Sequence, residues 1–172
     1  MPLPQNDRDR SKASLAVVCV GNWLISYDRI GPKVLALSEG RYGPDVALFD
    51  AGSAGLALLD CIDGQGLMMV VDACKTGGRT GEIHVTETDF EAEISPGPGL
   101  HQIGPMETLA VARQLFPEKL PHRLLFVLVE TDGMNDAQLD KAGHRVVSII
   151  EGEIAQFRAN RLAVGQTEQV EV

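Results

Sequence analysis

The sequence predicts a three-layer α/β/α sandwich around a twisted, mostly parallel five-stranded sheet, with one strand antiparallel. Two observations support this fold class. Short, continuously apolar runs alternate along the chain with segments of helical periodicity, and the connections between them are short. Continuous apolar runs are typical of strands covered on both faces. Right-handed crossovers between such strands place helices on both sides of the sheet.

The first strand and helix are the clearest elements. Leu15–Val20 is an apolar, largely β-branched run that ends at Gly21, so we expect the first strand there, at the centre of the sheet. Apolar residues then recur at helical spacing over Ile30–Glu39, and Gly40 offers a C-terminal stop. A strand followed by a helix begins the alternation.

The same unit is repeated further along the chain. Val46–Phe49 is expected to form a short strand that leads into Asp50, with a brief helix beyond Gly55. Leu67–Val71 is a third apolar run and ends in Asp72. Polar residues therefore follow each of the predicted strands, at the edge where α/β sheets build their sites.

The next segment changes character. Glu82–Thr86 is predicted to form a short strand that pairs antiparallel with the run before it. The prolines and glycines of Ser95–Gly99 exclude regular structure, so His101 is expected on a loop. A helix with a proline in its first turn is predicted over Pro105–Leu115.

The chain closes with a strand and a long helix. Leu124–Val129 is the last apolar run, and an apolar stripe predicts the final helix over Ala142–Leu162. No repeat or linker divides the 172 residues, so a single domain is expected. Residues 1–14 and 165–172 are polar and expected to be flexible.

Composition limits the partners of this domain. The formal net charge of −9 and the sequence pI near 4.8 oppose binding to a phosphate backbone, so nucleic acid is not an expected partner. No signal peptide or membrane-length apolar run is visible, so membrane insertion is not expected. The expected location is the cytoplasm. The odd number of widely spaced cysteines, three, predicts reduced thiols. We expect a monomer.

Three side chains are candidate metal ligands. Asp28 follows the first strand, Asp72 ends a later one, and His101 lies on the Pro-Gly loop. Carboxylate oxygens and imidazole nitrogens bind divalent ions, and ligands drawn from separate loops leave coordination positions open. The competing interpretation is structural, because aspartates at strand ends also cap helices or bond turn amides.

Four short motifs follow one another along the chain: GNWL at 21–24 with Asp28 and Gly31, DAGSAGL at 50–56, VVDA at 70–73, and HQxG at 101–104 with Glu107. From about Leu15 to Leu115 they resemble, in the same order, the motifs of the NiFe-hydrogenase maturation endopeptidases. Each motif alone is weak, but four in register on predicted strand ends are more specific.

The resemblance implies a fold, an activity and a site. It implies an aspartic-type endopeptidase that removes the C-terminal extension of a hydrogenase large-subunit precursor after nickel insertion. The family's metal-contacting and catalytic positions fall on Asp28, Asp72 and His101. Nickel would be supplied by the substrate, so that an empty precursor would lack the recognition signal.

The sequence departs from the family at two places. Tyr27 stands where relatives often have an acidic residue, and Arg29 follows Asp28. After the last strand, the segment from Glu130 to Gly133 lacks the proline common in relatives. These departures leave open a second function, a non-cleaving docking or chaperone factor for the same metal-loaded precursor.

Other chemistry is less favoured by the residues. Ser53 does not lie in a nucleophile elbow, and Cys74 is expected as a small buried thiol that could also reach a soft metal. The remaining histidines lack zinc-protease spacing and are expected at surfaces or strand edges; they are His84, His122 and His144. A Rossmann-like nucleotide binder is suggested by the fold class alone.

Overall fold

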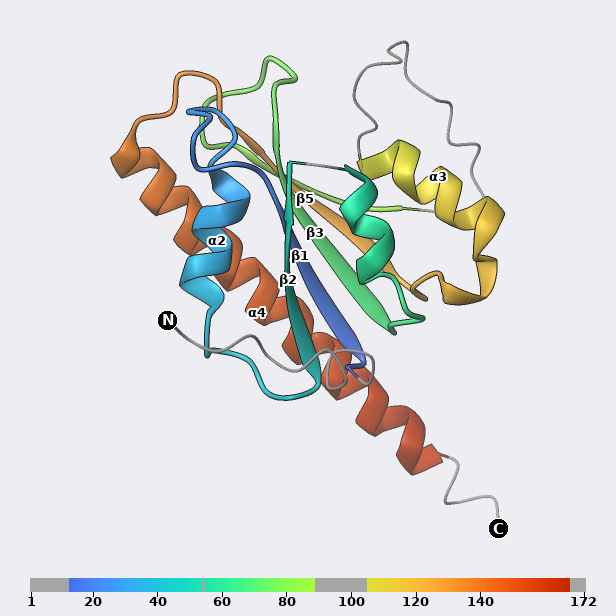
Figure 1. Ribbon diagram of the computed structural model, residues 1–172. Coiled ribbons are helices and arrows are strands. Elements are labelled where there is room, and N and C mark those ends of the chain that lie inside the picture. Colours follow the sequence, from blue (N-terminus) through green and yellow to red (C-terminus); the bar gives the residue numbers. More distant parts are fainter. Residues whose placement is uncertain (1–12, 54, 89–104, 168–172) are drawn as a thin grey trace.

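The computed structural model describes residues 13–53, 55–88 and 105–167, and these form one five-stranded sheet with helices on both faces (Figure 1). The three-layer α/β/α sandwich predicted from the sequence is confirmed. The strands are β1 (Leu15–Val20), β2 (Val46–Gly52), β3 (Leu67–Cys74), β4 (Ile83–Glu87) and β5 (Leu124–Glu130).

The strand order is β2-β1-β3-β5-β4, which corrects two sequence predictions. The strand in the middle of the sheet is β3, and β1 lies beside it. The edge strand β4 is antiparallel as expected, but it pairs with β5 and not with the strand that precedes it in the chain. Pairing depends on distant parts of the chain, so the local sequence of β4 could not reveal its neighbour.

The helices are divided between the two faces of the sheet. On one face lie α2 (Ile30–Ser38) and α4 (Asp136–Thr167), which pack side by side. On the other lie the 3₁₀ helix η1 (Gly55–Cys61) and α3 (Pro105–Leu115), followed by the short η2 (Pro117–Lys119). None of the helices in the described ranges is long and apolar enough to cross a bilayer.

Alternation along β3 divides the core into two halves. Met69 and Val71 belong to the core beneath α2 and α4, whereas Met68 and Val70 belong to the core beneath η1 and α3. All four side chains are fully buried. Because side chains alternate along a strand, Asp72 lies on the same face as Met68 and Val70, the face covered by η1 and α3.

Several elements extend beyond their predicted bounds. Both β2 and β5 run past their apolar residues, so that Asp50 and Glu130 lie within strands and not after them. The final helix begins at Asp136, well before Ala142. A capping box explains its start, because Asn135 Oδ1 accepts from Gln138 N at 2.9 Å and Gln138 Oε1 accepts from Asn135 N at 3.0 Å. Its last described residue is Thr167, so residues 165–167 of the segment predicted to be flexible belong to the helix, whereas 1–12 and 168–172 lie outside the described residues.

Candidate active site

The loop between β1 and α2 is closed by its own backbone. Gly21 N donates to Gly52 O on β2 at 2.8 Å, and Asn22 N donates to Asp28 O at 2.8 Å. Gly21 has φ +143°, and a Cβ there would lie 2.2 Å from Asp28 O. Only glycine fits at this position. The closure brings Asp28 back to the carboxyl end of β1, beside the end of β3.

The Asp28 carboxyl lies half-buried in this loop. Burial raises its pKa above the ordinary value, and a backbone hydrogen bond from Asn22 lowers it in part. The neighbouring Arg29 does not neutralise it. Its guanidinium Nη2 pairs with Asp136 Oδ1 at 2.9 Å, and its Nε donates to Ser26 O. The sequence departure at Arg29 therefore concerns the start of α4 and not the charge of the site.

Asp72 is the more perturbed carboxyl. It stands near the end of β3, where its Oδ1 accepts from Ala73 N at 2.7 Å. Burial raises the pKa of Asp72 to about 7, the Ala73 bond opposes this rise, and the negative charge of Asp28 adds to it. The contribution of Asp28 to the pKa of Asp72 indicates that the two carboxyls lie near one another at this edge of the sheet.

The pair lacks a positive partner in the described parts of the chain. Neither Asp28 nor Asp72 forms an ion pair there. Two half-buried carboxyls with raised pKa values gain stability when a cation replaces the water that they have lost. His101, the third predicted ligand, lies outside the described residues.

Asp50, the polar residue near the end of β2, bonds within its own turn. Asp50 is exposed on β2, and its Oδ1 accepts from Gly52 N at 2.9 Å within its own turn. Ser53 is likewise exposed. Asp50 thus makes the turn bond expected of a structural strand-end aspartate.

The two sequence departures contact each other at the rim of the site. Thr131 Oγ1 donates to Tyr27 O at 2.6 Å, and Lys75 Nζ lies 4.0 Å from the centroid of the Tyr27 ring. Lys75 also pairs with Asp132 at 3.1 Å. The loop after β5, which lacks the family's proline, is therefore tied to the loop that carries Asp28.

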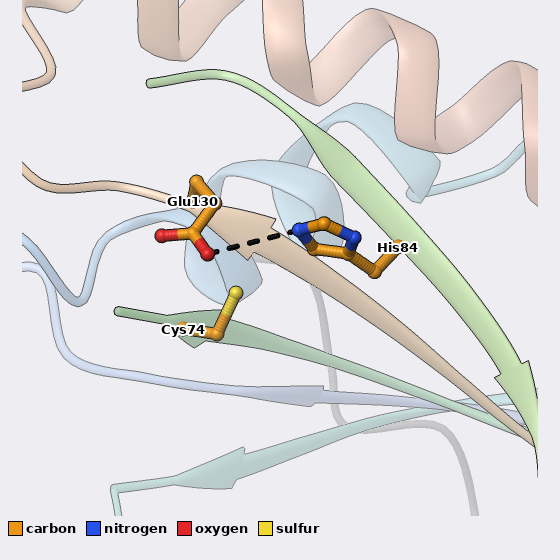
Figure 2. A group of neighbouring side chains, drawn as sticks. All are labelled: Cys74, His84 and Glu130. Atoms are coloured by element: carbon orange, nitrogen blue, oxygen red, sulfur yellow. Dashed lines mark ion pairs between the residues drawn. The ribbon is translucent and has the colours of Figure 1, made fainter. Parts of the chain in front are cut away.

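A second polar cluster lies at the ends of β3, β4 and β5, and the sequence analysis did not assemble it (Figure 2). Cys74, His84 and Glu130 offer ligand atoms that all lie within 4.8 Å of one another. Cys74 and Glu130 are register partners across β3 and β5. The only sequence signal was Cys74 itself, because the pairing of β5 with both neighbours is visible only in the folded sheet.

The loop after β1 does not offer the free backbone amides that a nucleotide-binding site would need for phosphate. Glycine-rich loops bind phosphate through free backbone amides. Here the first two amides after β1, those of Gly21 and Asn22, already donate to Gly52 O and Asp28 O. These two bonds close the loop around Asp28.

A separate hollow of about 800 Å³ lies between η1, α3 and η2. Asp50, Asp60, Gln65 and Lys119 are among its lining residues. Neither Asp28 nor Asp72 contributes to it. It runs along the η1 and α3 face, and the aspartate pair lies at the carboxyl edge of the sheet.

Comparison with known proteins identifies the relatives of this chain. A family model described as hydrogenase maturation protease matches residues 33–156, a range that includes Asp72 but begins after Asp28. The hydrogenase expression/formation protein HupM of Azotobacter chroococcum is 26% identical over 92% of this chain and 86% of its own.

Solved structures agree with this assignment in fold. The hydrogenase maturating endopeptidase HybD of E. coli superposes with a TM-score of 0.63 at 24% identity, covering 81% of this chain and 93% of that one. The solution structure of an endopeptidase from Escherichia coli gives 0.59 at 26% identity, with the same coverage. The family model covers well over half of the chain, and the chain therefore belongs to the hydrogenase maturation protease family.

Proposed function

We propose that this protein is the endopeptidase that removes the C-terminal extension of a nickel-loaded NiFe-hydrogenase large-subunit precursor. The observation that supports this most directly is the pair Asp28 and Asp72, two carboxyls with raised pKa values and no cationic partner among the described residues. His101 completes the proposed set. Nickel is the cargo of the substrate, and the protease contributes ligands to its open positions.

The charge balance of the pair explains how a loaded precursor is distinguished from an empty one. Without the ion, bringing the two carboxyls under a peptide increases their desolvation and their repulsion. With the ion, both carboxyls gain a positive partner at once. The same contacts therefore oppose the empty precursor and favour the loaded one.

Cleavage requires a polarised carbonyl and a base for the attacking water. Nickel close to the scissile bond would act as Lewis acid. A carboxyl of the pair would take the water proton, and a pKa of about 7 at Asp72 suits that exchange near neutral pH. We assign this chemistry to the aspartic type and expect it in the cytoplasm, where cysteines that form no disulfide, such as those of the described residues, stay reduced.

The exposed apolar side chains of the β1–α2 loop offer a docking surface for the precursor. Trp23 is 51% exposed, Leu24 is 92% exposed and Tyr27 is 48% exposed, and all three flank Asp28. Large exposed apolar groups beside a polar site are typical of protein-binding surfaces. The same surface would serve the alternative function, a docking factor that binds the loaded precursor without cutting it.

The direct test mixes the purified protein with precursor in its nickel-free and nickel-loaded forms. Intact-mass spectrometry should show shortening of the loaded precursor only. Shortening of both forms would contradict recognition through nickel. A stable complex with the loaded form and no shorter product would instead establish the docking factor.

A further inference from the structure

We infer that Cys74, His84 and Glu130 form a binding site for a divalent transition ion of the zinc class, separate from the nickel that the substrate carries. The three side chains come from the ends of β3, β4 and β5 and converge on one point (Figure 2). A thiolate, an imidazole and a carboxylate together are a borderline-soft donor set, which favours Zn²⁺ over Mg²⁺ or Ca²⁺.

The sheet register builds this cluster. Cys74 lies opposite Glu130 in the parallel pairing of β3 and β5, and His84 lies opposite Leu128 in the antiparallel pairing of β4 and β5. Residues two apart on a strand share a face, so Leu128 and Glu130 point the same way. All three donors therefore project from one face of the sheet.

The imidazole of His84 lacks the hydrogen bond that a buried ring nitrogen requires. Its Nε2 atom is buried. Among the buried side-chain nitrogen and oxygen atoms of the described residues, this atom is the one without a hydrogen bond. The facing Glu130 Oε1 is 3.7 Å away, too far for a hydrogen bond. Two ligands of one tetrahedral ion, at bond lengths of about 2.0–2.3 Å, lie roughly 3.3–3.6 Å apart. The gap therefore fits an ion between the two atoms better than a direct bond.

The carboxylate of Glu130 is already held in position. Its side chain is 1% exposed, and it accepts from Thr76 Oγ1 and from Thr76 N at 3.0 Å. Gly78 also donates through its backbone, and a Cβ at Gly78 would lie 3.0 Å from Glu130 Oε1. The turn thus wraps closely around the carboxylate. Ligands oriented by outer hydrogen bonds in this way are typical of metal centres.

Binding replaces the proton of Cys74 with the ion. The thiol releases H⁺ to solvent as the sulfur–metal bond forms, and a water molecule fills the fourth position. Because the donor atoms all lie within 4.8 Å of one another, a movement of at most about 1 Å brings any pair to tetrahedral spacing. The other two cysteines, Cys19 and Cys61, are buried in the core and cannot take part.

Cobalt is the probe that tests the site, because a thiolate ligand gives Co²⁺ a near-ultraviolet charge-transfer band. The untagged full chain, reduced and stripped with chelator, is titrated with Co²⁺ and then with Zn²⁺. We expect saturation at one equivalent, displacement by Zn²⁺, and a higher thermal midpoint with Zn²⁺ bound.

The variants identify the ligands. Cys74→Ser should abolish the band, and His84→Gln should weaken binding at least tenfold. His144→Gln is the matched control, because His144 Nε2 also faces a carboxylate, Asp140 Oδ2 at 3.8 Å, but without a third donor. It should bind as the wild type does. Circular dichroism of each metal-free variant verifies that it is folded.

Two results would overturn the proposal. One is the absence of a charge-transfer band in the folded wild-type protein, which would leave His84 and Glu130 as an ion pair only. The other is a band that survives His84→Gln and Glu130→Gln but is lost in Asp72→Asn. That pattern would assign the ion to the aspartate pair.

Discussion

Asp72 and Glu130 are carboxylic acids at the ends of two adjacent strands, yet their pKa values shift in opposite directions. Glu130 is the more buried of the two, with 1% of its side chain exposed, and its pKa is lowered. Asp72 is only half-buried, and its pKa is raised to about 7. Burial alone therefore does not decide the charge of a carboxyl at this edge.

The difference lies in the hydrogen-bond donors. Around Glu130, the Thr76 hydroxyl and the backbone amides of Thr76 and Gly78 all stabilise the carboxylate. Asp72 has the amide of Ala73, and its other neighbour is the negative Asp28. Glu130 thus receives several hydrogen-bond donors from the fold, whereas Asp72 receives one. We propose that this division separates a structural acid from a catalytic one.

The largest effect is expected from Asp72→Asn on cleavage. The amide keeps the shape and the bond from Ala73 N, but it can neither take a proton from water nor add a negative charge toward nickel. Cleavage of the loaded precursor should fall by about a hundredfold or more. Intact-mass kinetics under single-turnover conditions measures the loss, and unchanged kinetics would remove Asp72 from the mechanism.

Glu130→Gln should show the opposite role, in stability. The substitution removes the charge that the donors of Thr76 and Gly78 surround and places an amide N–H against one of them. In chelator, we expect the thermal midpoint to fall by about 3–8 °C. Scanning calorimetry provides the measurement. A midpoint equal to that of the wild type would mean that the turn does not depend on this carboxylate.

The pH dependence of stability sharpens the comparison. An unfolded aspartate ionises near pH 4, whereas folded Asp72 keeps its proton to about pH 7. Between these values the unfolded state binds fewer protons, so this group makes the fold less stable as pH rises and has no further effect above pH 7. Asp72→Asn removes that loss.

The measurement is the free energy of unfolding of both proteins in urea at pH 5 and at pH 8. The free energy of unfolding of Asp72→Asn, relative to that of the wild type, should rise by about 1–3 kcal/mol between pH 5 and pH 8. Groups with lowered pKa values, such as Asp45 and Glu87, titrate in both proteins and cancel in the difference. An advantage that stays constant with pH would contradict a raised pKa at Asp72.

The smallest effect is expected from Asp50→Asn, the matched control for Asp72→Asn. Asp50 also stands near the end of a strand and accepts one backbone bond, from Gly52 N, but its side chain is exposed. Cleavage should stay within about twofold of the wild type, since exposed polar substitutions change little. A loss comparable to that of Asp72→Asn would show that the polar edge acts as a whole.

Much of the fold could be predicted from short-range patterns. The bounds of β1 and α3 match their predicted ranges, because an unbroken apolar run and a proline-led amphipathic stretch are local signals. Asp28 and Asp72 could be selected as a pair because polar residues that follow parallel strands gather at one edge. The start of α4 was missed, although its capping residues Asn135 and Gln138 are visible in the sequence.

The sequence by itself determined which segments become strands and helices, since periodicity and caps act over a few residues. Only the tertiary structure decided the order β2-β1-β3-β5-β4, because strand pairing joins segments that are far apart in the chain. That order places Cys74 opposite Glu130 and brings the donors of Thr76 to the Glu130 carboxylate. The pKa values of Glu130 and Asp72 therefore depend on Thr76 and Asp28, which lie far from them in the chain.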